Sequence, residues 1–441
     1  MHVHHSKHHA SKRWLPWLLA VAIFTLVPVL HGTGLGAQLP HSTTLKQRTA
    51  SKQQQFLAAP KLCRAPCKNE RVPQLELVGS WPGTKNLTGQ HVTLATQLSL
   101  ARLDKLEAQC TAWPHPLVAA VYVPLVRGRI RSPEASEHDG IALSDARRDL
   151  KQFHKRMRQQ KGACDLRLRL YSERCDSATK AALYPFNAMR NRALDMVQTE
   201  AVMQLDVDFL VSKQFSRDLG KPASWAALRQ QLELTVAVVL PAFEANPELL
   251  RGGEAWNERE LRTAANLTQQ AVEGNKSWMV RHYKAGQVSQ FAGARFPEGH
   301  KCTNYRAWAG ATDFYSIHYE EGYEPYSVML RRHVPWHDER FRGYGRDKCV
   351  GYLTMWWWGV RFGVHPRAWV VHSPHPDGPA KAVTRELDLH QELKNKFYEV
   401  REELAAGSYV PATGFPQQCL LHKQQHKCRR KGRFGFRTGS T

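Results

Sequence analysis

Short runs of hydrophobic residues alternate with amphipathic stretches through the middle of this chain. A run rich in Val and Ala, or an alternation of apolar and polar residues, indicates a β-strand that is buried on one or both faces. Apolar residues that recur every three to four positions indicate a helix with one buried face. These patterns predict strands at 117–126, 166–171, 202–205 and 235–240, and helices at 142–161, 184–197 and 225–234.

Strands and helices thus follow one another in turn, which is typical of an α/β fold with parallel strands. Two later strands are expected at 360–364 and 368–372, and a long charged amphipathic helix at 380–404. Ligands of such sheets bind at the carboxyl ends of the strands. The predicted fold class is therefore α/β, with a binding site at that edge of the sheet.

The N-terminus predicts a membrane anchor. Residues 14–30 form an almost uncharged apolar run, preceded by Lys7, Lys12 and Arg13. This arrangement is typical of a signal anchor with its N-terminus in the cytosol and the bulk of the chain in the lumen, and a cleaved signal peptide is the alternative. The expected organisation is a cytosolic tail (1–13), the transmembrane anchor (14–30), a stem (31–110), a single large domain (111–405) and a basic C-terminal tail (406–441).

Charge and cysteine content restrict the partners and the compartment. The formal net charge is +23, which suits nucleic acid, an anionic polymer or a membrane surface. No nucleic-acid-binding module is recognisable, so we expect no nucleic-acid partner. Some of the nine cysteines should pair in an oxidising lumen, and the local pairs expected are Cys164–Cys175 and Cys419–Cys428.

The pair Asp206 and Asp208 stands at the end of the expected strand 202–205. Side chains two positions apart on a strand share one face, and a turn there would also let both reach one cation. Carboxylate oxygens suit Mg²⁺ or Mn²⁺, which can neutralise a phosphate group. Because two acids at this spacing are common on protein surfaces, the rest of the chain has to decide their role.

Four blocks of sequence surround and include this pair. They are Tyr184-Pro-Phe-Asn-Ala-Met-Arg-Asn; Leu205-Asp-Val-Asp-Phe-Leu; Gly299-His-Lys-Cys-Thr-Asn-Tyr-Arg-Ala-Trp with Glu324-Pro-Tyr; and His337-Asp-Glu-Arg-Phe-Arg-Gly-Tyr-Gly-Arg-Asp-Lys with Trp369-Val-Val-His-Ser-Pro-His. In order and spacing they resemble glycosyltransferase family 49, which contains LARGE-type and β-1,4-glucuronyltransferase enzymes. The resemblance implies a GT-A fold, which is a Rossmann-like α/β domain, with a UDP-sugar donor and Mn²⁺ (or Mg²⁺) as cofactor.

The resemblance also implies a metal site. Asp206 and Asp208 occupy the positions of the family's Asp-x-Asp motif, whose role is to hold the metal against the UDP diphosphate. His372 stands where the family has a late histidine that completes the metal site, and His375 is its substitute. The expected metal ligands are therefore Asp206, Asp208 and His372.

Three polar residues precede the Asp-x-Asp strand on one predicted helix. Asn187, Arg190 and Asn191 are spaced i, i+3 and i+4 and so share a helix face. A guanidinium and two amides there could bind the uridine or the diphosphate, with Asp206 completing the donor site. Helix capping and a salt bridge are the alternative role.

An inverting transfer needs a carboxylate that accepts the proton of the acceptor hydroxyl. Asp338, Asp347 and Glu339 are the candidates. Asp338 matches the family's Asp-Glu-Arg-Phe pattern, and Asp347 follows a Gly-Tyr-Gly loop at a position where the family more often has Asn. Each could instead form a structural salt bridge with a neighbouring Arg or Lys.

The expected function is that of a metal-dependent inverting glycosyltransferase, single-pass type II in the Golgi membrane with a lumenal catalytic domain. It would transfer a sugar, glucuronic acid by resemblance, from a UDP-sugar to a glycan or glycoprotein acceptor. The alternative is an inactive secretory glycan-binding protein or scaffold of the same fold. The run Trp356-Trp357-Trp358 is expected to fill the core from a helix.

Overall fold

The computed structural model describes residues 72–84, 92–126, 133–251 and 256–415, with 133–141 described by backbone only. All of these residues belong to one compact unit of the chain. The expected cytosolic tail, the anchor (14–30) and residues 31–71 of the expected stem lie outside the described residues. Within the described ranges, no helix is both long enough and apolar enough to cross a membrane.

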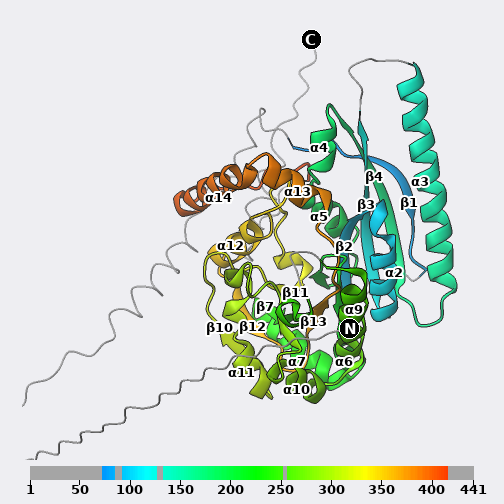
Figure 1. The fold of residues 1–441 in the computed structure, drawn as a ribbon. Coiled ribbons are helices and arrows are strands. Elements are labelled where there is room, and N and C mark those ends of the chain that lie inside the picture. Colours follow the sequence, from blue (N-terminus) through cyan, green and yellow to red (C-terminus); the bar gives the residue numbers. More distant parts are fainter. Residues whose placement is uncertain (1–71, 85–91, 127–132, 252–255, 416–441) are drawn as a thin grey trace, which may run out of the picture. The chain divides into compact units, whose positions relative to one another are not determined.

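A nine-stranded mixed sheet forms the centre of this unit (Figure 1). In spatial order its strands are β1 (Glu76–Trp81), β4 (Asp165–Cys175), β3 (Pro116–Val126), β2 (Val92–Ser99), β5 (Ala201–Gln204), β11 (Tyr326–Leu330), β7 (Val236–Leu240), β12 (Arg361–Val364) and β10 (Tyr315–Ile317). The four neighbours β4, β3, β2 and β5 are parallel, as are β7 and β12. The α/β class with parallel strands is thus confirmed.

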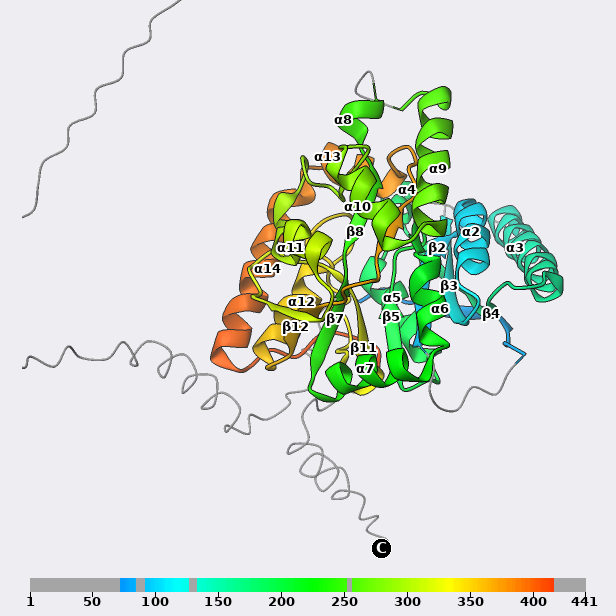
Figure 2. The ribbon, with the colours of Figure 1, turned by 90° about the horizontal axis from the view of Figure 1, so that it is seen from below.

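Helices cover both faces of the sheet. They are α2 (Leu103–Ala112), α3 (Pro133–Gln159), α4 (Ala178–Ala182), α5 (Phe186–Asp195), α6 (Lys213–Leu219), α7 (Pro222–Glu233), α8 (Pro247–Leu250), α9 (Glu258–Glu273), α10 (Lys276–Lys284), α11 (Tyr305–Gly310), α12 (Cys349–Trp357), α13 (Pro379–Glu386) and α14 (Leu389–Ala406), with 3-10 helices η1 (Leu100–Arg102), η2 (Pro297–Gly299), η3 (Lys301–Thr303) and η4 (Arg331–His333). In both views α2 and α3 lie together beside β3 and β4 (Figure 2).

The two faces of the sheet carry separate hydrophobic cores. Along β3, Leu117 and Ala119 pack into the core that α2 and α3 cover, whereas Val118 and Ala120 pack into the core that α5 covers. A strand buried on both faces needs apolar residues at every position. This requirement explains why the sequence of β3 is an uninterrupted apolar run.

A second, four-stranded sheet continues from the first. Its strands are β6 (Phe209–Val211), β13 (Val370–His372), β8 (Ala242–Ala245) and β9 (Val288–Gln290), in the order β6-β13-β8-β9. The chain passes from β5 of the large sheet to β6 of the small one through residues 205–208. Since β13 pairs antiparallel with β6, His372 lies opposite Phe209 and so beside Asp208, although the two strands are far apart in sequence.

The ordered domain begins earlier than the sequence predicted. Residues 76–81, 92–99 and 103–112, assigned above to the stem, form β1, β2 and α2, and β2 lies between β3 and β5 in the sheet. Strand β1 is an edge strand with exposed residues, and β2 includes the polar residues Thr93, Thr96 and Gln97, all of which are buried. Neither strand therefore presents the apolar run by which the others were recognised.

The C-terminal elements also differ from the prediction. The expected helix 380–404 is two helices, because Asp388 takes a left-handed conformation (φ 51°) between α13 and α14. Residues 407–415, placed above in the basic tail, continue the domain, and Ala412 is buried. Trp356 is 37% exposed and stacks on Tyr319 near the end of α12, so core filling was wrong for this residue.

The disulfide prediction was wrong in its pairing. Cys164 bonds to Cys110, which lies near the end of α2. Cys164 precedes β4 and Cys175 ends it, so 11 residues of extended strand separate them, a span of roughly 35 Å. Cys175 is a buried free thiol, and Cys419 and Cys428 lie outside the described residues.

Candidate active site

The Asp-x-Asp segment lies where the chain leaves the large sheet. The Leu205 N–H donates to the carbonyl of Ala95 on β2 (3.0 Å), and the Phe209 N–H donates to the carbonyl of Asp206 (3.0 Å). The first bond extends the parallel pairing of β5 and β2, and the second closes a turn. As predicted, the two acids stand at the carboxyl end of a parallel strand, the edge at which ligands of α/β sheets bind.

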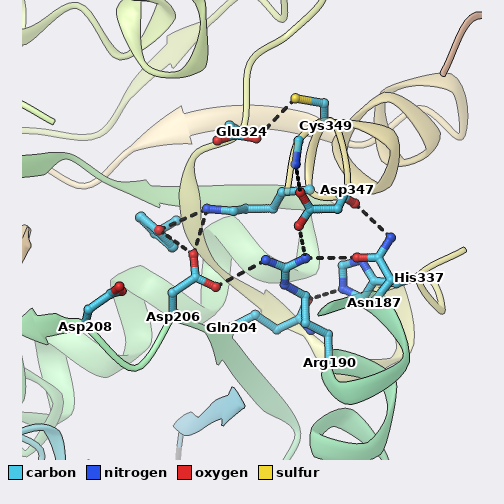
Figure 3. Close-up of polar contacts among 12 residues, drawn as sticks. Asn187, Arg190, Gln204, Asp206, Asp208, Glu324, His337, Asp347 and Cys349 are labelled. Atoms are coloured by element: carbon cyan, nitrogen blue, oxygen red, sulfur yellow. Dashed lines mark hydrogen bonds and ion pairs between the residues drawn. The ribbon is translucent and has the colours of Figure 1, made fainter. Parts of the chain in front are cut away.

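Asp206 is held by two cations and a phenol. Its carboxylate accepts from the Tyr326 hydroxyl (2.8 Å) and pairs with Lys348 Nζ (3.0 Å) and Arg190 Nη2 (3.3 Å). Burial alone would raise the pKa of Asp206, but the charges of Lys348 and Arg190 hold it well below its usual range. Asp206 is therefore a fixed anion whose oxygens already have partners within the protein (Figure 3).

Among the residues that the structure describes, no hydrogen bond or ion pair joins the Asp208 carboxylate to the network that holds Asp206 (Figure 3), and this carboxylate instead lies beside two histidines and an arginine. His375 Nε2 lies 2.7 Å from its Oδ2, Arg102 Nη1 3.0 Å and His372 Nε2 3.9 Å. The other oxygen, Oδ1, is buried and has no hydrogen-bond partner among the described residues. Burial opposes ionisation, but the hydrogen bond with His375 and the nearby His372 lower the pKa of Asp208 to about 2.

These groups fit a divalent cation. One ligand atom each of Asp208, His372 and His375 lie within 4.8 Å of one another, and no other such group of three occurs among the described residues. Burial lowers the pKa of His372 to about 3, which keeps its imidazole neutral and able to bind metal. The structure thus brings together two of the three predicted ligands, Asp208 and His372, and adds His375, whereas Asp206 faces Arg190 and Lys348.

A cavity of 1130 Å³ opens above the acids. It extends from the carboxyl ends of β2 and β3 to α13 and α14 on the other side. Its walls include the aromatic residues Tyr184, Phe186 and Tyr344 and several cationic side chains, namely Arg102, Arg190, Arg251, Arg295, Arg346, Lys348, Lys381 and Lys394. Its volume is that of a site for a ligand of drug size or larger.

Helix α5 contributes one of its three predicted donor-binding residues to this cavity. Arg190 lines it, but Asn187 and Asn191 are fully buried behind it. The Asn187 amide donates to the carbonyls of Asp338 and Asp347 (both 2.9 Å), and the Asn191 amide to the carbonyl of His337 (2.9 Å). The prediction that these two asparagines contact the donor is therefore corrected: their amides form hydrogen bonds with backbone carbonyls of the loop 337–347.

Two of the three predicted base candidates do not line the cavity. The Asp338 side chain is fully buried and forms a two-oxygen ion pair with Arg340 (shortest distance 2.7 Å). Glu339 accepts from Asn191 (2.8 Å) and from the Thr413 hydroxyl (2.9 Å). The Asp338 pair therefore braces the loop internally, and the Glu339 carboxylate joins the loop to α5 and to Thr413, so both acids have structural contacts instead of a place at the cavity.

Asp347 does line the cavity, but both of its oxygens are engaged. Oδ2 lies 2.5 Å from Arg190 Nη1, and Oδ1 accepts from the Gly345 N–H (3.2 Å). Arg190 therefore stands between Asp347 and Asp206 and pairs with each (Figure 3). This continuous network ties the Asp-x-Asp turn to the Gly-Tyr-Gly loop.

Residues 91–406 match the family model described as glycosyl-transferase for dystroglycan, which is glycosyltransferase family 49. The chain belongs to this family. The resemblance drawn from the four sequence blocks is thus confirmed, and residues 91–406 form the domain that defines this glycosyltransferase family.

Curated relatives of this family 49 chain include larger proteins. It is 25% identical over 311 residues to the Caenorhabditis elegans glycosyltransferase-like protein LARGE (69% of this chain, 42% of that protein). It is 28% identical over 337 residues to the human xylosyl- and glucuronyltransferase LARGE2 (74% and 40%). The chain therefore spans less than half the length of these relatives.

Sequence identity to solved structures is lower than to these relatives. The crystal structure of GalNAc-T7 with UDP, GalNAc and Mn²⁺ gives a TM-score of 0.30 at 12% identity, covering 71% of this chain and 52% of that one. The structure of S. aureus TarS 1-349 gives 0.27 at 11% identity, covering 77% and 78%.

The family 49 site contains groups that sequence reasoning did not single out. Tyr326 and Lys348 hold Asp206, Arg102 pairs with Asp208, and Glu324 lines the cavity. Glu324 and Tyr326 belong to the quoted Glu-Pro-Tyr block, and Lys348 ends the Gly-Tyr-Gly block, so their presence in matched motifs was the available signal. Arg102 carried none, because it lies in the segment assigned to the stem.

Proposed function

We propose that this glycosyltransferase transfers a sugar from a UDP-sugar to a glycan or glycoprotein acceptor, with inversion at the anomeric carbon and with the help of a divalent metal. One observation carries the proposal: the cluster of Asp208, His372 and His375 lies at a cavity that also holds Arg102, Arg190 and Lys348. A metal site beside several cations suits a diphosphate, which needs more than one positive charge to leave.

Asp208, His372 and His375 would hold the metal, and the buried Oδ1 of Asp208 offers it an unpaired lone-pair site. When bound, the ion acts as a Lewis acid on the leaving diphosphate. Two imidazoles with one carboxylate suit Mn²⁺ better than Mg²⁺, which prefers oxygen ligands throughout. We therefore expect Mn²⁺ to be the more effective of the two ions.

We assign the donor and the acceptor to different parts of the cavity. Arg102 follows β2, and Tyr184 and Phe186 line the same wall, so this side offers a cation for phosphate and aromatic faces for uracil. Lys348 and Arg190 keep Asp206 ionised and oriented at the centre. The acceptor would enter on the side of Arg295, Arg346 and α14.

The donor and the compartment are proposed on separate grounds. Human LARGE2 is named as a xylosyl- and glucuronyltransferase, and the cationic walls of the cavity suit the carboxylate of glucuronate. We propose UDP-glucuronate as the donor. The Cys110–Cys164 disulfide supports an oxidising compartment, and with residues 14–30 as an anchor we propose a type II protein of the Golgi membrane whose GT-A domain is lumenal.

A donor screen tests this function. The chain is expressed from residue 72 on, without the proposed anchor, and is incubated with Mn²⁺ and each common UDP-sugar. Release of UDP is measured with and without xylose-terminated acceptors. We expect release that depends on Mn²⁺ and is largest with UDP-glucuronate. Mn²⁺-dependent release from a different UDP-sugar would correct the donor alone. No release from any donor would favour the inactive glycan-binding alternative.

A further inference from the structure

The carboxylates that line the cavity differ in what already binds them. Apart from Asp206 and Asp208, the described residues contribute Glu244, Glu248, Glu324, Asp347 and Asp377. Asp347 pairs with Arg190 and Asp377 with Lys381 (2.8 Å). Glu244 accepts from the Ala292 N–H through Oε1 (2.8 Å) and pairs with Arg295 through Oε2 (3.6 Å). Glu248 is exposed on the short helix α8. A proton acceptor needs an oxygen that is both enclosed by the site and free to bind a proton, and these four do not offer one.

Glu324 satisfies both conditions. It lies two residues before β11, is partly buried, and faces the cavity. Among the described residues, the Cys349 thiol alone donates a hydrogen bond to its carboxylate, to Oε2 (3.1 Å), and Oε1 accepts none. Figure 3 shows Glu324 and Cys349 facing each other on the far side of the network from Asp208.

We propose that Glu324 is the catalytic base of this glycosyltransferase and that Cys349 positions it. The proposal rests on the proposed function, since a base is needed only if a sugar is transferred with inversion. It replaces the three candidates expected from the sequence, of which two are buried in the loop and the third is neutralised by Arg190.

Transfer with Glu324 as the base is a single displacement at the anomeric carbon. The acceptor hydroxyl oxygen forms a bond to the anomeric carbon on the face opposite the diphosphate, and its proton passes to Oε1 of Glu324. The bond between the anomeric carbon and the β-phosphate oxygen breaks, and its electron pair leaves with UDP. Inversion results from the single displacement, and Glu324 returns its proton to solvent after product release.

The surroundings of Glu324 shift the pKa of its carboxyl. Burial raises the pKa of its carboxyl, as do the charges of Asp347 and Asp206, whereas Lys348 and the Cys349 thiol oppose the rise. Tyr326, Tyr344 and Tyr352 lie close enough to interact with its charge. A base is most effective when its pKa approaches the working pH. Removing the thiol donor should therefore raise the pKa further and free Oε2 to rotate away from the acceptor.

Substitution of Glu324 tests the proposal. In the full chain we expect Glu324→Gln to lower kcat by about 10²–10³-fold, which is within the usual contribution of general-base catalysis. The KM for the UDP-sugar and the affinity for UDP with Mn²⁺ should stay within about threefold, since the donor side is untouched. Glu107→Gln, which removes a surface carboxylate paired with Arg156, is the matched control and should leave kcat unchanged.

Substitution of Cys349 gives a second readout, the kcat–pH profile, which would not change if the role of Cys349 were purely structural. Cys349→Ala should shift the acidic limb of the kcat–pH profile to higher pH, because a hydrogen bond that favours the ionised carboxylate is lost. Cys349→Ser, which keeps a donor, should restore the limb. If Glu324→Gln does not fold, Glu324→Asp replaces it, with an expected 10–100-fold fall in kcat and unchanged UDP binding.

The outcomes are distinguishable. A wild-type chain that transfers sugar while Glu324→Gln keeps more than a tenth of its kcat overturns the role of Glu324 and leaves the proposed function standing. A wild-type chain that transfers from no donor overturns both proposals together. An acidic limb that is identical in wild type and Cys349→Ala overturns the positioning role of Cys349.

Discussion

Asp208→Asn is expected to abolish more than 99.9% of transfer, a loss of about 10³-fold or roughly 4 kcal/mol of transition-state stabilisation. Asp208 is the carboxylate at the centre of the metal cluster, with His375 at 2.7 Å and His372 at 3.9 Å from its Oδ2. An amide has a similar shape but no charge, and it presents an N–H₂ group on one side. It would therefore weaken metal binding without removing side-chain volume.

The loss should appear in metal binding as well as in rate. Mn²⁺ titration followed by electron paramagnetic resonance, with transfer measured in parallel, separates the two. Asp149→Asn serves as the control, because Asp149 is exposed on α3 and pairs only weakly with Arg148 (3.6 Å). If Asp208→Asn transferred sugar at the wild-type rate, the assignment of the metal site would be wrong.

Arg190→Met is expected to destabilise the fold by about 3–5 kcal/mol, the usual result of removing one partner from a buried ion pair. The Arg190 side chain is 8% exposed and pairs with both Asp347 (2.5 Å) and Asp206 (3.3 Å). Without it, Asp347 loses its cation and Asp206 keeps only Lys348 and Tyr326. The two carboxylates would then repel each other across the space that the guanidinium occupied.

Urea denaturation followed by circular dichroism measures this change. The control is Arg169→Met, because Arg169 forms a comparable pair with Asp195 (2.7 Å) nearer the surface and should cost about 1 kcal/mol or less. Arg190→Met combined with Asp347→Asn should be less destabilised than the sum of the two single variants, since the unpaired carboxylate is then absent. Additive effects, or a loss below about 1 kcal/mol in Arg190→Met, would show that the network does not stabilise the fold.

Elements with strong periodicity were predictable from the sequence. Strand β3 is buried on both faces and therefore reads as one apolar run, and α5 begins after Pro185 as its pattern indicated. Strand β2 was missed because its polar residues Thr93 and Gln97 are buried within the fold, where hydrogen bonds such as Thr93 to Thr199 (2.6 Å) compensate them. Such compensation depends on distant residues and leaves no local signal.

The residues that form the site were more predictable from the sequence than the contacts that each of them makes. The family motifs singled out Asp206, Asp208 and His372, and helix spacing singled out Arg190; the structure brings all four to one cavity. The roles of Asn187 and Asn191 were not predictable, because spacing on a helix shows which residues share a face but not whether that face meets a ligand or a loop. Likewise Asp338 and Glu324 are both acids in matched blocks, and only the fold shows that the first is enclosed by Arg340 and the second faces the cavity.

In the proposed function, the Asp208–His372–His375 cluster, beside Arg102 and Lys348, is a site for a metal and a nucleoside diphosphate. Calorimetric titration of the wild-type protein with UDP tests it most directly, first with Mn²⁺ and then with the metal chelated by EDTA. We predict UDP binding that requires Mn²⁺ and is lost in His372→Ala and His375→Ala. UDP binding that is equally strong in EDTA, or that survives both histidine substitutions, would contradict the claim.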